Sequence, residues 1–226
     1  MKHTFYLLAS ALLISFTSCD KDNDIDTDET RAAFSIRKAS DSSMQQNAAT
    51  VTNSTGGTFT FSRVMLGISE IDFEQEIGNK DQDYELEGPF RYDVLTQKSD
   101  PAIDVVSIAP GTYHELEFEL DKVLSSGKSI EIAGTYTQGA TTYRFEFTSE
   151  MEEDFDIDNP EGIDAMAGQT AGFVLQLNLE SLFKGIDFSR ATTDNDSVIR
   201  INRSSNTQLA SFIEDRFEEI MDFDRD

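Results

Sequence analysis

The sequence contains no tryptophan, one cysteine, two histidines and four prolines. A lone cysteine, Cys19, excludes an intramolecular disulfide. Transition-metal centres are built from several histidine or cysteine ligands, so a chain with so few of either cannot form one. The sequence also contains no glycine-rich phosphate loop, no G-x-S-x-G motif and no apolar run of about 20 residues that could span a membrane. These absences exclude several common enzyme classes and a membrane-spanning helix.

Basic residues are scarce as well. The chain has 18 Lys and Arg against 43 Asp and Glu, which gives a net charge of −25. Such a chain repels phosphate backbones, so a nucleic acid partner is excluded. A strongly anionic protein remains soluble and attracts cationic partners, among them Ca²⁺.

The N-terminal residues have the pattern of a secretory signal. Lys2 precedes an apolar run of 12 residues, FYLLASALLISF, at positions 5–16. This run is shorter than the roughly 20 residues of a transmembrane helix, and it predicts a signal peptide over residues 1–18. The small residues Thr17 and Ser18 before Cys19 resemble a bacterial lipobox, although Phe16 stands where leucine is usual. We therefore expect cleavage before Cys19 and attachment to a membrane through lipid on that residue; an ordinary signal peptide is the alternative.

An acidic tract follows Cys19, with aspartate at every second position. Because like charges repel and there is little apolar surface to bury, we expect residues 19–30 to form a disordered tether. The tract also resembles the acidic export signal of surface lipoproteins, which would place the protein on the outer face of an outer membrane. A simple solvated spacer is the alternative. The export-signal residues are Asp20, Asp22, Asp24, Asp26 and Asp28.

From residue 31 onward, apolar and polar residues alternate with the period of β-strands. The clearest strand is 113–120, where Leu116, Phe118 and Leu120 alternate with glutamates. The stretch 58–76 changes its apolar phase twice, which predicts bulges or a break in the strand near Gly67. We interpret 40–57 as a loop, Gly88-Pro89 as a turn, and 129–148 as a hairpin around Gly139. Eight to ten short strands predict one antiparallel β-sandwich domain over 31–226, immunoglobulin-like or prealbumin-like.

The C-terminal segment changes to helical spacing. The apolar residues of one helix face are Leu209, Phe212, Ile213, Phe217, Ile220 and Met221, and Asn206 or Thr207 can cap its start. We expect this helix to pack its apolar face against the sheet.

Several segments resemble a known group of proteins. YELEGPFRYDVL at 84–95 precedes IAPGTYHELEFELD at 108–121, and LFKGIDFSRA at 182–191 precedes SVIRINRSSN at 197–206. This order resembles surface lipoproteins of Bacteroidetes type that carry a β-sandwich domain of unknown function. The resemblance implies a surface lipoprotein and brings no catalytic residues with it.

One acidic segment could bind a metal ion. Asp154, Asp156 and Asp158 have the spacing of the first three ligands in a calcium loop. The rest of the segment departs from a calcium loop. Pro160 stands next to the position where the loop needs a turn glycine, and Ala165 stands where the loop has its bidentate glutamate. A strand with its aspartates outward is the alternative. Apart from calcium, no cofactor is expected.

The remaining candidates for chemistry are few. His114 lies on the same side of the predicted strand as Leu116 and Phe118, so we expect it at the rim of the core. No motif of a catalytic triad accompanies it. The sequence favours a lipid-anchored, non-enzymatic binding or structural lipoprotein whose partner is a glycan or an envelope or host protein. A glycan hydrolase that uses two carboxylates and a fimbria-like assembly subunit are the alternatives.

Overall fold

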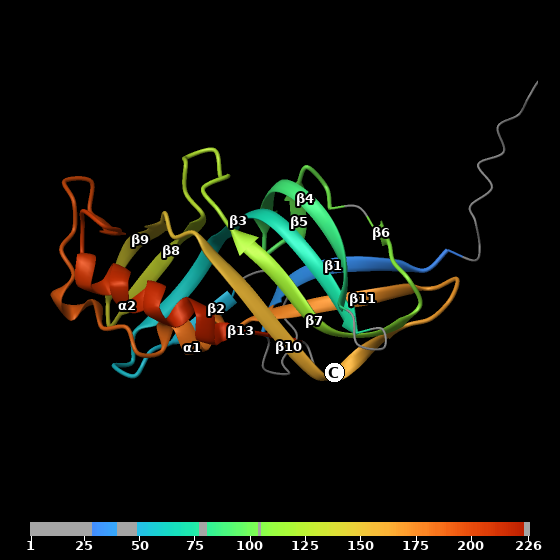
Figure 1. The fold of residues 1–226 in the computed structure, drawn as a ribbon. Coiled ribbons are helices and arrows are strands. Elements are labelled where there is room, and N and C mark those ends of the chain that lie inside the picture. The colour runs from blue at the N-terminus through green and yellow to red at the C-terminus, as the bar shows by residue number, and fades with distance from the viewer. Residues whose placement is uncertain (1–28, 40–48, 77–80, 104, 224–226) are drawn as a thin grey trace, which may run out of the picture.

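The computed structural model describes residues 29–39, 49–76, 81–103 and 105–223. These residues form two β-sheets and a small helical region (Figure 1). The larger sheet contains β2 (Ala49–Thr52), β3 (Thr58–Glu76), β4 (Asp81–Asp93), β5 (Lys98–Asp100), β7 (Gly111–Leu120), β8 (Ile130–Gln138), β9 (Thr141–Ser149), β10 (Glu153–Ala165) and β12 (Val198–Ile201). The smaller sheet contains β1 (Arg31–Lys38), β6 (Val106–Ser107), β11 (Thr170–Leu177) and β13 (Met221–Phe223). The helical segments are α1 (Leu179–Phe183), η1 (Phe188–Arg190), α2 (Thr207–Phe217) and η2 (Glu218–Ile220).

The long strand β3 is the axis of the larger sheet. It has two partners in succession on each edge, β2 and then β4 on one side, β8 and then β7 on the other. The register shifts between Phe61 and Arg63 and again between Ile68 and Glu70. These shifts confirm the bulges predicted from the two phase changes. Each bulge returns the apolar side chains to the inner face, so one strand serves both halves of the sheet.

The smaller sheet covers the half of the larger sheet that contains β4 and β7. Phe173 of β11 contacts Phe73 of β3, with ring centroids 4.6 Å apart, and Tyr113 of β7 at 5.6 Å. All three side chains are almost fully buried. The two sheets therefore pack face to face as a sandwich, and the mainly β fold predicted from the sequence is confirmed.

The helical segments cover the other half of the larger sheet, beside β8 and β9 (Figure 1). Aromatic rings fill the space beneath them. Phe59 of β3 lies 4.8 Å from Tyr136, 5.1 Å from Phe183 of α1 and 5.1 Å from Phe188 of η1. The predicted C-terminal helix is α2, and its Phe217 packs against Phe155 of β10. The helix ends earlier than predicted, since Ile220 lies in η2 and Met221 in β13, which pairs with β11. One hydrophobic cluster joins both halves of the sandwich.

Two local predictions are wrong. The stretch 40–57, interpreted as a loop, contains the strand β2, whose Ala49 and Val51 are buried. Gly88-Pro89, interpreted as a turn, lies inside the continuous strand β4. Gly88 sits opposite the second bulge of β3, where an added Cβ would lie 2.6 Å from the carbonyl oxygen of Ser69. Glycine is needed there for close approach of the two strands rather than for a turn.

The sheets are also less uniform than the predicted antiparallel sandwich. β1 pairs with β11 in parallel, and β12 pairs with β9 in parallel. Both pairs join segments that are distant in sequence, and alternation of apolar residues gives no information on strand direction. The predicted hairpin is confirmed, because β8 and β9 pair from Ile130↔Ser149 to Gln138↔Thr141 around Gly139.

Candidate functional site

The outer face of the larger sheet is covered by carboxylates where β10, β7, β3 and β4 lie side by side. In the register of these strands, three rows of four acidic residues cross the sheet. We call this surface the acidic face. Its rows are Asp154–Glu119–Glu70–Glu87, Asp156–Glu117–Asp72–Glu85 and Asp158–Glu115–Glu74–Asp83. Every outward position of this block is thus Asp or Glu.

Strand alternation produces the acidic face. On the inner side of the same strands, Ile71, Phe73, Leu116, Phe118 and Phe155 are at most 3% exposed. Burial of these side chains fixes the register, because a slip by one residue would turn the carboxylates into the core. The bulge between Ile68 and Glu70 sets the phase on β3. The carboxylates of β3 and β7 are half-buried, whereas those of β4 and β10 are exposed.

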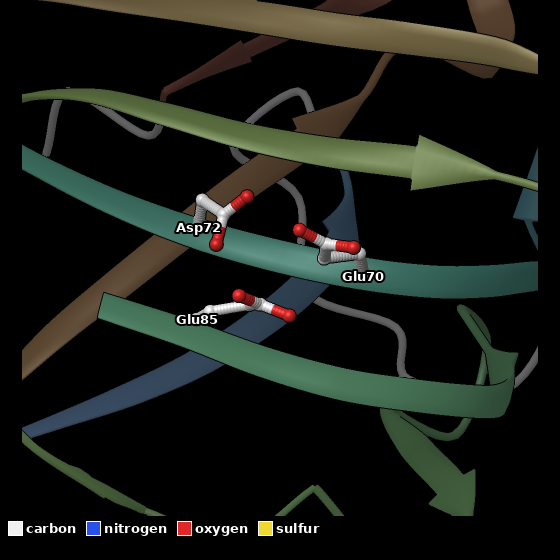
Figure 2. Close-up of side chains that lie close together, drawn as sticks. All are labelled: Glu70, Asp72 and Glu85. Carbon is white, nitrogen blue, oxygen red and sulfur yellow. The ribbon is translucent and has the colours of Figure 1, made fainter. Parts of the chain in front are cut away.

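Three carboxylates converge near the middle of the acidic face. Glu70 and Asp72 occupy consecutive outward positions of β3, and Glu85 approaches from β4 (Figure 2). One oxygen from each of the three lies within 4.8 Å of the other two. We call these residues the carboxylate triad. Hard cations such as Ca²⁺ are bound by oxygen ligands of this type.

Burial and like-charge repulsion both lower the acidity of carboxyl groups on this face. The pKa of Asp72 is raised from 3.8 to about 7, first by burial and then by a hydrogen bond with Glu70 and the charges of its carboxylate neighbours. The pKa of Glu85 is raised mainly by the charge of Glu70. The pKa of Glu117 is raised by burial and by the charges of Asp156 and other neighbours. Near pH 7, Asp72 is therefore protonated about half of the time, whereas an isolated aspartate would be fully ionised.

Asp154, Asp156 and Asp158, the predicted calcium ligands, lie on β10 at alternate outward positions. The structure has the strand alternative rather than the loop, because Phe155 and Ile157 are buried against β7. Alternate residues of a strand are about 6.8 Å apart, so the three aspartates do not converge as loop ligands do. They contribute one column of the acidic face instead.

His114 is exposed, so the prediction that it lies at the rim of the core is wrong. Tyr113 takes the inward position and is 1% exposed. The reason is a register shift against β10 between Asp158 and Ile163, which changes the phase of β7 before Leu116. The imidazole Nδ1 lies 3.3 Å from the carbonyl oxygen of Asn159.

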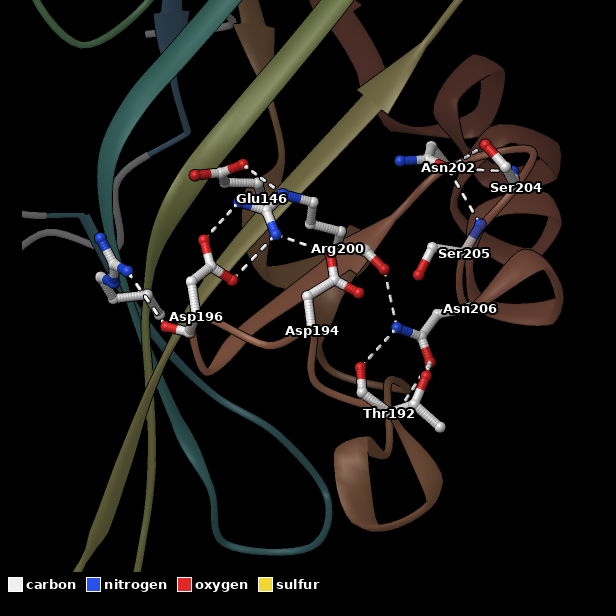
Figure 3. A network of polar contacts seen from close by, with 10 residues as sticks. Glu146, Thr192, Asp194, Asp196, Arg200, Asn202, Ser204, Ser205 and Asn206 are labelled. Carbon is white, nitrogen blue, oxygen red and sulfur yellow. Dashed lines mark hydrogen bonds and ion pairs between the residues drawn. The ribbon is translucent and has the colours of Figure 1, made fainter.

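A second polar cluster fixes the segment before α2. Arg200 of β12 binds Asp194 at 2.6 Å, Asp196 at 2.7 Å and Glu146 of β9 at 3.3 Å (Figure 3). Its guanidinium lowers the pKa of Asp196 to about 2. Since all three carboxylates of this cluster contact Arg200, we interpret it as a structural network rather than a site.

The asparagine predicted as a helix cap belongs to the same region. The backbone oxygen of Asn206 accepts from the amides of Leu209 and Ala210 and so begins α2. Its side chain bonds elsewhere, to the backbone of Thr192 and to the carbonyl oxygen of Arg200. Asn206 thus ties the helix start to the preceding loop.

The proposed lipidation site Cys19 and the export-signal aspartates lie outside the described residues. Among the helices of the described part, none is long and apolar enough to cross a membrane. Comparison of the chain with family models, with curated proteins and with solved structures finds no match.

Proposed function

We propose that this chain is a lipid-anchored envelope lipoprotein whose sandwich domain is a non-enzymatic binding module exposed on the cell surface. The signal-like residues 1–18, the lipobox-like residues before Cys19 and the aspartate tract at 20–28 support this location. The resemblance to surface lipoproteins of Bacteroidetes type supports it as well.

The acidic face supports the binding role and suggests the partner. Strands lie about 4.8 Å apart and alternate residues about 6.8 Å apart, so the block measures about 14 Å in each direction. One cation with ligands at about 2.5 Å occupies a small part of such an area. A segment rich in Lys and Arg, on another envelope protein or a host protein, complements the whole face. Its approach would be accelerated by long-range attraction.

The hydrolase alternative gains less support. A glycosidase needs two carboxylates that flank the bond to be broken, one of them with a raised pKa. Asp72 has such a pKa, but it lies on the outer surface of a sheet beside exposed side chains. The assembly-subunit alternative needs a strand that can leave its sheet. β1 instead pairs with β11 along all eight of its residues.

Binding of a basic peptide tests the proposal. Decalysine is titrated into the purified lipidated chain and into a variant with Glu70→Gln, Asp72→Asn and Glu85→Gln. A matched variant removes three charges elsewhere, with Glu161→Gln, Asp215→Asn and Glu219→Gln. Loss of three ion pairs at the surface should weaken binding about tenfold in the first variant.

In the matched variant, binding of decalysine should stay close to that of the wild type. Equal weakening in both variants would show that net charge, and not the acidic face, attracts the peptide. That outcome would contradict the proposed binding surface.

Protease digestion of intact cells tests the location separately. The wild type should be digested, and Cys19→Ala should be lost from the membrane fraction. A variant with the five aspartates of the 20–28 tract changed to asparagine should remain membrane-bound but protected. Protection of the wild type, while other surface proteins are digested, would contradict surface exposure.

A further inference from the structure

A hollow of about 740 Å³ lies beside the start of α2, bordered by η1, the loop after it and the turn that follows β12. Ligand pockets for small molecules typically have volumes of about 300–1,000 Å³. None of the residues that line the hollow belongs to the acidic face. It is therefore a separate feature, and its interpretation does not depend on the proposed partner of that face.

The walls of the hollow are held in place before any ligand arrives. The side chain of Asn206 links the start of α2 to the backbone of Thr192 (Figure 3). Its oxygen accepts from the amide of Thr192, and its nitrogen donates to the carbonyl oxygen of Thr192, both at 2.9 Å. The carboxylate of Asp187 accepts from the backbone amide and the hydroxyl of Ser189, both at 2.8 Å. Behind this loop, Arg200 is fixed by its three carboxylate partners. A preformed site loses less conformational entropy on binding than a mobile one.

The lining combines an aromatic ring with groups that form hydrogen bonds. One part of the wall is formed by Phe212, whose ring is covered on one face by the guanidinium of Arg216, 4.2 Å from the ring centroid. Other parts carry the hydroxyl of Thr207 and the amide of Gln208, which both donate and accept. Asp187 and Arg190 add one charge of each sign, so the charge of the lining is balanced.

A ring with apolar C–H faces and hydroxyl groups at its edge satisfies both parts of this lining. A ligand with a net charge would be attracted by one of Asp187 and Arg190 and repelled by the other, so the lining favours a ligand without net charge. We infer that the hollow binds an uncharged saccharide unit, with its apolar face toward Phe212 and its hydroxyls toward Gln208 and Thr207. The protein would then have two independent binding surfaces, one for a basic partner and one for a glycan.

The test uses the full chain made without lipid by Cys19→Ala. It is applied to a printed array of neutral and acidic oligosaccharides, and the strongest neutral ligand is then titrated in solution. Ala191→Trp fills the hollow and should abolish binding. Gln208→Ala removes a hydrogen-bonding group and should weaken binding about tenfold. Ser211→Ala alters an exposed residue of the same helix that does not line the hollow and should leave binding unchanged.

Thermal unfolding of each variant shows whether it is folded, and Gln208→Ala decides the question if Ala191→Trp does not fold. The inference is overturned if no neutral oligosaccharide binds, if only acidic ones bind, or if Gln208→Ala binds like the wild type. Retention of binding by a folded Ala191→Trp variant would overturn it too. The acidic-face variant should bind the sugar normally, which separates a failure here from a failure of the proposed function.

Discussion

The charge of the acidic face affects folding at Asp72. Its pKa in the folded chain is about 7, against an ordinary value of 3.8, because it is half-buried and has Glu70, Glu85 and Glu117 as neighbours. Between these two pH values the folded chain holds a proton that the unfolded chain releases. The stability contributed by this group is therefore present below about pH 4 and is lost as the pH rises to about 7.

Asp72→Asn should therefore stabilise the protein at neutral and alkaline pH. The asparagine cannot ionise, so it removes the repulsion that the carboxylate experiences. At pH 8 the free energy of unfolding should rise by about 1 kcal/mol, because water at the surface screens most of the interaction. At pH 4 the variant and the wild type should differ little. Urea unfolding at both pH values measures this, with the exposed Asp215→Asn on α2 as control; a stability loss at pH 8 would refute the explanation.

Orientation of single residues was predictable where a strand alternates without interruption. In β9, Tyr143, Phe145 and Phe147 alternate with polar residues; Phe145 and Phe147 point inward, whereas Tyr143 is 36% exposed. Tyr143 pairs with Tyr136 near the turn end of the hairpin, where less of the neighbouring structure covers it. His114 was misplaced because the bulge that changes its phase depends on β10, about 45 residues further along the chain.

At the scale of elements, the edge of β1 depends on one tyrosine. β6 pairs only with Arg31 and Ala32 of that strand. Further along, the hydroxyl of Tyr92 accepts from the backbone amide of Ile36 at 2.8 Å and donates to its carbonyl oxygen at 3.1 Å. Tyr92 is 2% exposed, so these bonds are shielded from water. The hydroxyl thus takes the place of a neighbouring strand at this position.

Tyr92→Phe should leave two buried backbone groups of Ile36 without this partner. Unsatisfied buried groups cost about 1–3 kcal/mol, so we expect the free energy of unfolding to fall by about 2 kcal/mol. Chemical denaturation measures the change. Tyr143→Phe is the matched control, since its ring is partly exposed, and it should have little effect. Equal stability of Tyr92→Phe and the wild type would show that water replaces the hydroxyl.

Elements with strong local patterns were predicted from the sequence. The other elements depend on contacts between distant segments, which only the folded structure shows. The hairpin of β8 and β9 and the helix α2 each follow from residues close in sequence. β2 was missed because its four residues include two threonines within a polar stretch. The parallel pairing of β1 with β11 joins residues about 140 positions apart, and no local pattern encodes such a contact.

At the scale of the whole molecule, the acidic face combines features that the sequence shows only separately. Alternating glutamates on β7 and aspartates on β10 were visible as single columns. Their union with the carboxylates of β3 and β4 depends on strand order and on the bulge after Ile68. A net charge of −25 alone does not reveal that twelve carboxylates share one surface.

The most direct test of the proposed function is to locate bound decalysine on the molecule. Backbone amide signals of the isotope-labelled protein are followed by NMR as decalysine is added. We predict that the shifted signals belong to β10, β7, β3 and β4, with the largest changes around Asp72 and its cross-strand neighbours. Shifts spread evenly over the surface, or confined to the helical end beside β8 and β9, would contradict binding at the acidic face.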